Sequence, residues 1–206
     1  MTLRLSLRTI SAILAVFAPF QALRAQEAAA YFGLGSAHDG SNGAQIDTFS
    51  DGSLHNTPSL GGLFGHIGAT VFITKHIGVG AEIAWRPSQA DYAGIQYRPT
   101  FYTFDAVYRP PKGSTKRFAP ELRAGIGGVR LNFFPNDDLS CAQVPGCPSS
   151  DHFQVHVAAA GRWYFTDHLF LRPAFDLHYV NNLTEFGSNW VPQYSVGIGY
   201  SLGRGE

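Results

Sequence analysis

The sequence predicts an all-β fold: an eight-stranded antiparallel up-and-down transmembrane barrel that follows a cleaved signal peptide. Three observations support this prediction. The chain opens with an export-type segment, the remainder alternates apolar and polar residues, and long connections between the alternating segments take turns with short ones. A chain of 206 residues is also of the size expected for one domain.

The composition excludes several classes of protein. Lys and Arg total 15 and Asp and Glu total 15, so the chain lacks the large basic surface of a nucleic-acid-binding protein. Charged residues make up only 15% and aromatic residues 14% of the chain, and there are 23 glycines and two cysteines. A coiled coil, a disordered tail and a disulfide-rich scaffold all fit this composition poorly.

Residues 1–25 have the pattern of a signal peptide. Arg4 and Arg8 precede an apolar run from Thr9 to Phe20, and a small residue, Ala25, lies at the expected cleavage site. The run is shorter than the roughly 20 residues that a spanning helix needs, which favours cleavage over an uncleaved anchor. We therefore expect a signal peptide at 1–25 and an outer-membrane β-barrel domain at 26–206. Cleavage removes three arginines and no acid, so the mature chain is mildly acidic.

Eight segments of the mature chain read as strands. In the third, Ile77, Val79 and Ile83 share one parity, whereas Glu82 and Arg86 fall on the other. The full set is 29–37, 59–73, 77–86, 102–108, 120–126, 152–163, 171–179 and 193–202. Their lengths are close to the 9 to 11 residues that a tilted membrane strand needs.

The connections between these strands alternate in length. Long connections are expected at 37–58, 87–94, 133–150 and 181–189, and short ones at 74–76, 110–117 and 166–168. Outer-membrane barrels have this pattern, with short periplasmic turns and long external loops. Trp85, Trp163, Tyr164 and Trp190 fall near strand ends, where aromatic girdles form.

The charged residues of the strands fall on the parity opposite the apolar one. An arginine that faces lipid at mid-depth costs about 2–4 kcal/mol, so we expect these side chains to face inward and pair across a filled interior. The predicted lumen charge network is Glu82, Arg86, Asp105, Glu121, Arg123, Arg162, Arg172 and Asp176. The alternative is the solvated face of a soluble sheet.

Five residues fit regular strands poorly. Pro99, Pro173 and Pro192 remove ladder donors, so bulges or strand ends are expected at them. Arg98 and Arg130 have lipid-side parity and should lie at rims or beside a bulge, for which Gly127–Gly128 is a candidate.

Cys141 and Cys147 lie in a segment rich in Pro, Asp, Asn and Ser. In an exported protein this favours a loop disulfide, since a reactive free thiol needs a His partner and a low-pKa setting.

The signal peptide and three glycine-containing strand motifs resemble the small outer-membrane barrels of the OmpA/OmpX type, the outer-membrane protein beta-barrel domain group. These motifs are Gly33–Gly35, Ile77–Glu82 and Gly197–Gly203. The resemblance covers the whole mature chain and implies a place in the bacterial outer membrane, with its lipids, lipopolysaccharide and barrel-insertion machinery as partners. One departure concerns insertion: such barrels commonly end on an aromatic residue, whereas this chain continues past Leu202 to Glu206.

The expected function is that of a non-enzymatic barrel with a structural role or a role mediated by its loops. One alternative is a membrane hydrolase like the lipid A deacylases, suggested by His178, Asn181 and the nearby Glu185, but Val180 stands where the nucleophilic Ser would be. A second alternative is a soluble, lipocalin-like ligand-binding barrel with the reverse orientation of its side chains.

No metal or cofactor is expected. His38 with Asp39, and Asp47 with Asp51, are more typical of loop turns than of a cation site. His152 and His156 share the inward parity without a third ligand that the sequence places near them, which favours packed, hydrogen-bonded histidines.

Overall fold

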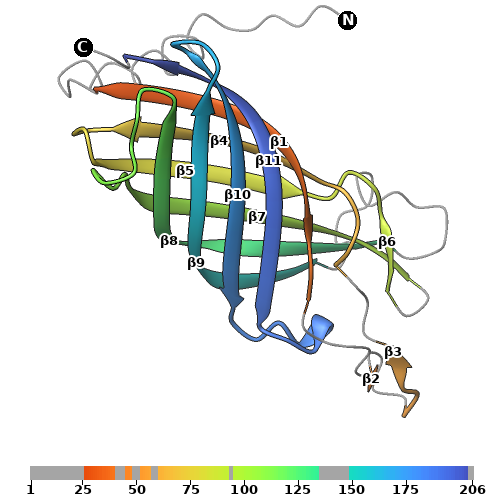
Figure 1. Cartoon of the computed structure of the whole chain (residues 1–206). Coiled ribbons are helices and arrows are strands. Elements are labelled where there is room, and N and C mark those ends of the chain that lie inside the picture. Colours follow the sequence, from red (N-terminus) through yellow and green to blue (C-terminus); the bar gives the residue numbers. More distant parts are fainter. Residues whose placement is uncertain are drawn as a thin grey trace, which may run out of the picture.

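The computed structural model describes residues 26–39, 45–47, 52–56, 60–92, 95–134 and 149–203. Eight long strands form the wall of a barrel: β1 Glu27–Ala37, β4 Phe64–Phe72, β5 Ile77–Trp85, β7 Ile95–Tyr108, β8 Phe118–Phe134, β9 Ser149–Tyr164, β10 Leu169–Val180 and β11 Trp190–Leu202. Each pairs antiparallel with the strand before and after it, and β1 pairs with both β4 and β11, which closes the sheet (Figure 1). The predicted eight-stranded up-and-down barrel is confirmed.

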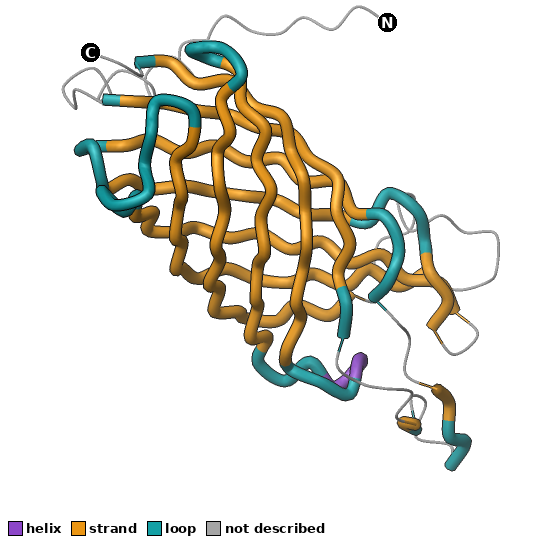
Figure 2. Tube along the Cα trace, in the orientation of Figure 1, coloured by secondary structure: helices purple, strands orange, loops and turns teal. Residues whose placement is uncertain are grey.

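Short elements lie at the loop end of the barrel, the end opposite the described turns of 73–76, 109–117 and 165–168. β2 Gln45–Ile46 and β3 His55–Asn56 form a separate ribbon, and a 3₁₀ helix spans Thr184–Phe186 (Figure 2). β6 Ala90–Tyr92 pairs with the start of β7, so a strand hairpin occupies much of the connection predicted at 87–94. Within the described residues no helix has the length and apolarity to cross a membrane.

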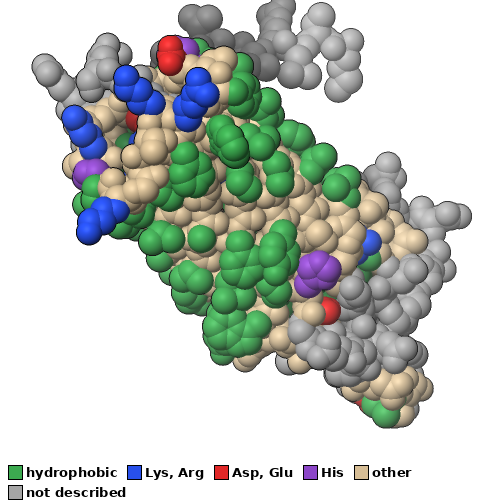
Figure 3. Space-filling model, in the orientation of Figure 1, with side chains coloured by type: hydrophobic (Ala, Val, Ile, Leu, Met, Phe, Trp, Pro, Cys, Tyr) green, Lys and Arg blue, Asp and Glu red, His purple; other side chains and the backbone are tan. Residues whose placement is uncertain are grey.

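The two faces of the wall differ sharply in polarity. In β11, Tyr194, Val196 and Ile198 are each more than half exposed, whereas Gln193 and Ser195, on the other parity, are buried. Large apolar side chains are exposed in the same way on the outer face of all eight strands (Figure 3 shows part of it). This is the reverse of a lipocalin-like barrel, whose apolar side chains would line a cavity, and it is typical of a barrel surrounded by lipid.

The prolines are accommodated without a shift of register. Pro99 lies one residue beyond the last β5 pair of β7, and Pro192 lies one residue beyond the last β1 pair of β11, so each occupies a place where a neighbouring strand ends. Pro173 interrupts the β9–β10 ladder between Leu171 and Ala174, and the same register resumes after it. A proline has no N–H to donate, and these positions limit the loss to a few ladder bonds.

The bulge suggested at Gly127–Gly128 is absent. β8 pairs residue by residue with β7 and with β9 through both glycines, so Arg130 keeps its outward parity. Arg130 is exposed near the loop end, and its Nε lies 3.8 Å from Oδ1 of Asp151 on β9. The guanidinium of Arg98 lies over the Phe134 ring at the same end. The rim alternative is therefore the one that the structure supports for both arginines.

The expected aromatic residues are divided between the two faces. Trp163 and Trp190 are 62% and 52% exposed, at the turn end and the loop end respectively. Tyr164, which was predicted to join a girdle, is instead 2% exposed and points into the barrel. Tyr164 points inward because successive strand side chains alternate between the two faces and the preceding residue, Trp163, faces outward.

The outer face gives a direct test of the membrane setting. Ile126 is 57% exposed at the middle of β8, so an Ile126→Arg substitution places a charge against lipid and should lower the free energy of unfolding by about 2–4 kcal/mol. Urea unfolding of the barrel in lipid vesicles measures this loss. Ser114→Arg, in an exposed turn, is the control and should change stability by less than about 1 kcal/mol. Equal, small effects of the two substitutions would contradict a lipid-facing wall.

Candidate functional site: the charged interior of the barrel

The interior is built by the inward parity of all eight strands. Seven of the eight residues predicted for the charge network have buried side chains, at most 7% exposed, and Arg162 and Arg172 are among the largest fully buried ones. These seven are Glu82, Asp105, Glu121, Arg123, Arg162, Arg172 and Asp176. A buried charge is tolerated only when it is paired and hydrogen-bonded, so the contacts of each group decide what the interior can do.

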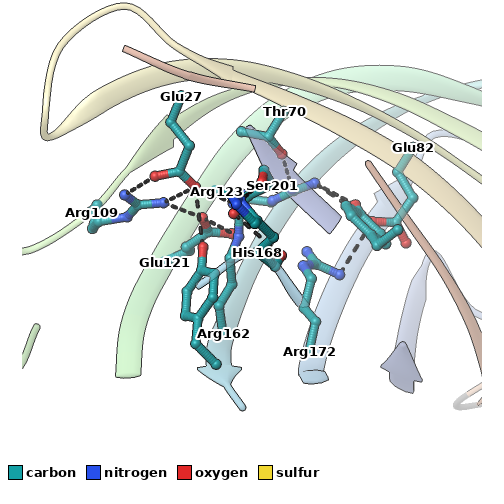
Figure 4. A network of polar contacts seen from close by, with 12 residues as sticks. Glu27, Thr70, Glu82, Arg109, Glu121, Arg123, Arg162, His168, Arg172 and Ser201 are labelled. Atoms are coloured by element: carbon teal, nitrogen blue, oxygen red, sulfur yellow. Dashed lines mark hydrogen bonds and ion pairs between the residues drawn. The ribbon is translucent and has the colours of Figure 1, made fainter. Parts of the chain in front are cut away.

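A turn-end cluster joins two arginines and two glutamates. Arg162 Nη1 lies 2.7 Å from Glu27 Oε1 and Arg162 Nε lies 2.8 Å from Glu121 Oε1 (Figure 4). Arg109 bridges the same two carboxylates, with its Nη1 at 2.8 Å from Glu27 Oε2 and its Nη2 at 3.4 Å from Glu121 Oε1. The Tyr164 hydroxyl donates a further hydrogen bond to Glu27, 3.1 Å away. Charges of opposite sign alternate, so the cluster is electrically balanced.

Arg109 closes the interior from the turn that follows β7. Its guanidinium lies over the Phe72 ring, 3.9 Å from the centroid, and makes a bidentate pair with Glu27. Burial by itself would lower the pKa of Arg109, but the hydrogen bonds and the negative charge of Glu27 raise that pKa above its ordinary value. The arginine therefore stays charged at any physiological pH.

A central cluster surrounds Glu82 on β5. The Tyr31 hydroxyl donates to Glu82 Oε2 at 2.5 Å, and His66 Nδ1 lies 2.9 Å from Glu82 Oε1. Two arginines complete the shell, with Arg123 Nη1 at 3.5 Å and Arg172 Nη1 at 3.7 Å from Glu82 Oε2. Four partners from four other strands thus converge on one carboxylate, which ties opposite sides of the wall together.

Arg123 connects this cluster to its surroundings. It donates to Thr70 Oγ1 at 2.6 Å (Figure 4) and to the Tyr31 hydroxyl at 2.9 Å. Its Nη1 also lies 3.8 Å from Asp105 Oδ2. Arg172 lies over the Tyr31 ring, 4.1 Å from its centroid. Tyr31 is therefore both a hydrogen-bonding partner and an aromatic surface for the two guanidinium groups.

A third group lies farther toward the loop end. His156 Nδ1 is 2.8 Å from Asp105 Oδ1 and His156 Nε2 is 3.0 Å from Asp176 Oδ1, so both ring nitrogens face carboxylates. Both can donate only in the imidazolium form. His178 stacks on His156 with ring centroids 4.6 Å apart, and Phe101 lies beside it.

Beyond these histidines, toward the loop end, lies a cluster of buried apolar side chains. Leu60, Leu183 and Phe186 come from the loops and pack against Phe64 and Phe101 of the wall. Between this apolar cluster and the charged groups, a cavity of about 10 Å³ is lined by side chains that include Thr103, His178 and Gln193. That volume is close to the space of a single water molecule.

Arg86 takes a different place from the other predicted residues. It follows the last residue of β5, is half-buried, and its guanidinium lies close to Gly62 of the long first loop. Among the ion pairs of the described residues, those of the interior do not include Arg86. The inward parity holds only while the strand continues, and β5 ends at Trp85.

The structure adds interior residues that the sequence reading did not include. Glu27 precedes the expected first strand, 29–37, and Tyr31 lies within it. Both share the parity of Ala29 and Gly33, and this parity was the available signal. Arg109 lies in a turn, where alternation gives no information. Its pairing with Glu27 and Glu121 depends on the turn folding back over the barrel opening, which only the tertiary structure shows.

The loop end carries a smaller polar cluster. His152 Nε2 lies 2.7 Å from Ser150 Oγ and 3.0 Å from Glu185 Oε1, and His152 Nδ1 lies 3.2 Å from the carbonyl oxygen of Asn181. A nucleophile–base pair needs the acid on the far nitrogen of the ring, whereas here the hydroxyl and the carboxylate share one nitrogen. The cluster is arranged to fasten the 181–189 loop to the start of β9.

The residues of the alternative hydrolase reading are not assembled as a catalytic site. His178 is 3% exposed and stacked inside the barrel, Val180 is buried, and Glu185 contacts His152. Within the described part of the chain, no group of three His, Cys, Asp or Glu side chains has the arrangement of a metal site. Cys141, Cys147 and Asp51 lie outside the described residues.

Comparisons with known proteins agree with this geometry. No family model matches the chain, and no curated protein matches its sequence. Solved structures do match. OprG of Pseudomonas aeruginosa is 16% identical with a TM-score of 0.55, over 86% of this chain and 96% of that one. The attachment invasion locus protein Ail of Yersinia pestis is 13% identical with a TM-score of 0.53, over 85% and 98%.

A third match is the N-terminal β-barrel domain of OprF from Pseudomonas aeruginosa, 13% identical with a TM-score of 0.51, over 87% of this chain and all of that domain. At these identities the likeness concerns the fold. The chain has the fold of the small eight-stranded outer-membrane barrels, as its strand motifs indicated.

The network is expected to behave as a unit when one member is removed. Arg123→Met leaves Glu82 and Asp105 with fewer partners in a buried setting and should cost about 3–5 kcal/mol of unfolding free energy. Arg130→Met breaks the exposed pair with Asp151 and should cost no more than about 1 kcal/mol. Guanidinium unfolding of both variants in the same detergent compares them. A loss below about 1 kcal/mol for Arg123→Met would show that the interior pairs do not stabilise the barrel.

Proposed function

We propose that this chain is a non-enzymatic outer-membrane barrel with a filled polar interior, which serves as a rigid structural element and presents its long loops at the cell surface. In this proposal residues 1–25 are a signal peptide that directs export and is removed, and residues 26–206 are the barrel domain that the barrel-insertion machinery places in the membrane. Lipids and lipopolysaccharide are then its immediate partners.

The observation that supports this function best is the polarity of the wall. Side chains such as Phe104 and Ile198 are exposed on the outside at 65% and 54%, while ionised side chains are paired on the inside. Facing water, the outer surface would be an apolar patch far larger than monomeric soluble proteins expose. Facing acyl chains, the same surface is stabilised.

The filled interior supports a structural role over transport. The charged clusters and the apolar loop-end cluster leave a cavity of only about 10 Å³ among the central residues. A porin needs a continuous aqueous lumen, which eight strands with large interior side chains do not provide. The same packing makes the wall rigid, and a rigid wall is a suitable support for variable loops.

The loops are the part of the molecule available for recognition. Ail, one of the matched folds, is named the attachment invasion locus protein, and its crystal structure has been determined in complex with the heparin analogue sucrose octasulfate. A sulfated ligand suits this chain poorly, because its described loop end includes the carboxylates of Asp39, Asp47, Asp151 and Glu185, which would repel sulfate groups. We propose that any surface partner is recognised by the loops, whose proposed Cys141–Cys147 disulfide would restrain the 133–150 connection.

Fractionation tests the membrane placement. The full chain should sediment with the outer membrane, resist extraction by alkali and migrate faster on gels before heating than after it, because a closed barrel binds less detergent than the unfolded chain. A variant lacking residues 2–25 should remain in the cytoplasm and show no heat-modifiable migration. Release of the full chain by osmotic shock, without heat-modifiable migration, would overturn the proposed location.

Conductance tests the filled interior. The barrel reconstituted in planar bilayers should give no steady ion conductance, because in this proposal paired charges and apolar side chains fill the interior, and the cavity among the central residues has a volume of only about 10 Å³. Heat-modifiable migration of the barrel from the same preparation shows that it is folded. Current steps that increase in number with the amount of inserted barrel would contradict a structural, non-conducting interior.

A further inference from the structure

The described part of the lipid-facing wall has shallow hollows at more than one place, including one of about 420 Å³ between β1, β4, β10 and β11 and a larger one that adjoins two basic turns. On the outer face of β4, β5 and β7, a recess of about 490 Å³ is lined mainly by Ala69, Val71, Val79, Ala81, Phe104 and Ala106, together with Gly80 and Asp105, whose side chain is buried. The strand register sets these residues side by side, with Ala69 opposite Ala81 and Ala81 opposite Phe104. Neighbouring positions carry larger, exposed side chains: Ile67 and Ile83 toward the loop end, and Ile77 and Tyr108 toward the turn end.

Two basic turns border the recess. Lys75 follows Val71 by four residues, so it lies within about 14 Å of it along the chain. The turn that carries Lys112 begins immediately after β7, one strand away. The two turns are joined directly, because Arg109 N–H donates to the His76 carbonyl at 2.8 Å and His76 Nδ1 lies 3.0 Å from the Arg109 carbonyl.

Both turns carry positive charge and no negative charge. Residues 73–76 and 109–117 contain Lys75, Lys112, Lys116 and Arg117, all exposed, and neither segment contains an acid. Figure 3 shows Lys and Arg side chains gathered at the turn end of the molecule. A site of this kind, an apolar hollow with cations at its aqueous border, is complementary to a lipid that has an acyl chain and a negatively charged headgroup.

We propose that the recess and the two basic turns bind one anionic phospholipid of the inner leaflet, with an acyl chain in the recess and the phosphate between Lys75 and Lys112. This inference rests on the proposed function, because it needs the turn end to lie at the periplasmic border of the membrane. A second copy of the chain is the less suitable occupant. A symmetric pair formed through this face would bring its basic turns toward one another, and like charges repel.

Native mass spectrometry of the barrel, extracted from its membrane in detergent, tests the site. The probes are phosphatidylglycerol and phosphatidylcholine with identical acyl chains. The wild-type barrel should retain one phosphatidylglycerol in preference to phosphatidylcholine. A cation near a membrane surface strengthens binding of an anionic lipid about fivefold, so Lys75→Gln with Lys112→Gln should weaken phosphatidylglycerol retention by about 25-fold.

Filling the recess provides an independent arm. Ala81→Leu projects into the hollow from the outer face and should weaken retention of both lipids without unfolding the barrel. The matched controls are Ala159→Leu, an exposed outward-facing position on β9, and Arg130→Gln at the loop end, both of which should bind phosphatidylglycerol as the wild type does.

Each outcome has a distinct meaning. Equal retention of the two lipids by a folded, heat-modifiable barrel, or unchanged retention in the double Lys variant, overturns the lipid site and leaves the membrane placement intact. A dimer mass that Ala81→Leu abolishes assigns the recess to a second copy and overturns the proposal. A chain that never reaches the membrane fraction overturns both the proposed function and this site.

Discussion

The structure depends on pairing ionised side chains in a space from which water is largely excluded. A guanidinium or carboxylate buried alone would destabilise the barrel by several kcal/mol, so each must find a partner of opposite charge. Glu82 shows how this requirement is met, with Tyr31, His66, Arg123 and Arg172 around one carboxylate. Because these residues belong to different strands, the barrel has to close before the network can form. Closure and pairing therefore stabilise each other.

The same requirement divides the molecule along its axis. Ion pairs occupy the turn end and the centre, and apolar packing of Leu60, Leu183 and Phe186 against the wall occupies the loop end. Loop side chains that pack into this apolar core restrain the loops that carry them. The contacts of His152 with Asn181 and Glu185 restrain the 181–189 loop in addition. Sequence variation in such a protein is best tolerated in the loop segments that make no contact with this core.

Alternation of apolar and polar residues predicted most of this arrangement. Parity alone assigned Glu121, Arg123 and Arg172 to the interior, because successive strand side chains point to opposite faces and the apolar parity could only face lipid. Parity gave no information where a strand ended or a turn folded back. Arg86 lies beyond the end of β5, and Arg109 closes the barrel from a turn. Tyr164 points inward because its neighbour Trp163 points outward. The girdle prediction for Tyr164 was wrong because it rested on closeness to a strand end and not on parity.

The sequence by itself determined the number of strands, their order and the face on which each residue lies, because a period of two and the lengths of the connections are local properties of the chain. Only the tertiary structure decided which charges meet. Glu27 and Arg162 are 135 residues apart in sequence and 2.7 Å apart in space, and Arg109 reaches the same carboxylate from a turn. Such contacts depend on the stagger between strands around the closed wall. No local pattern records that stagger, because closure fixes it only when the last strand meets the first.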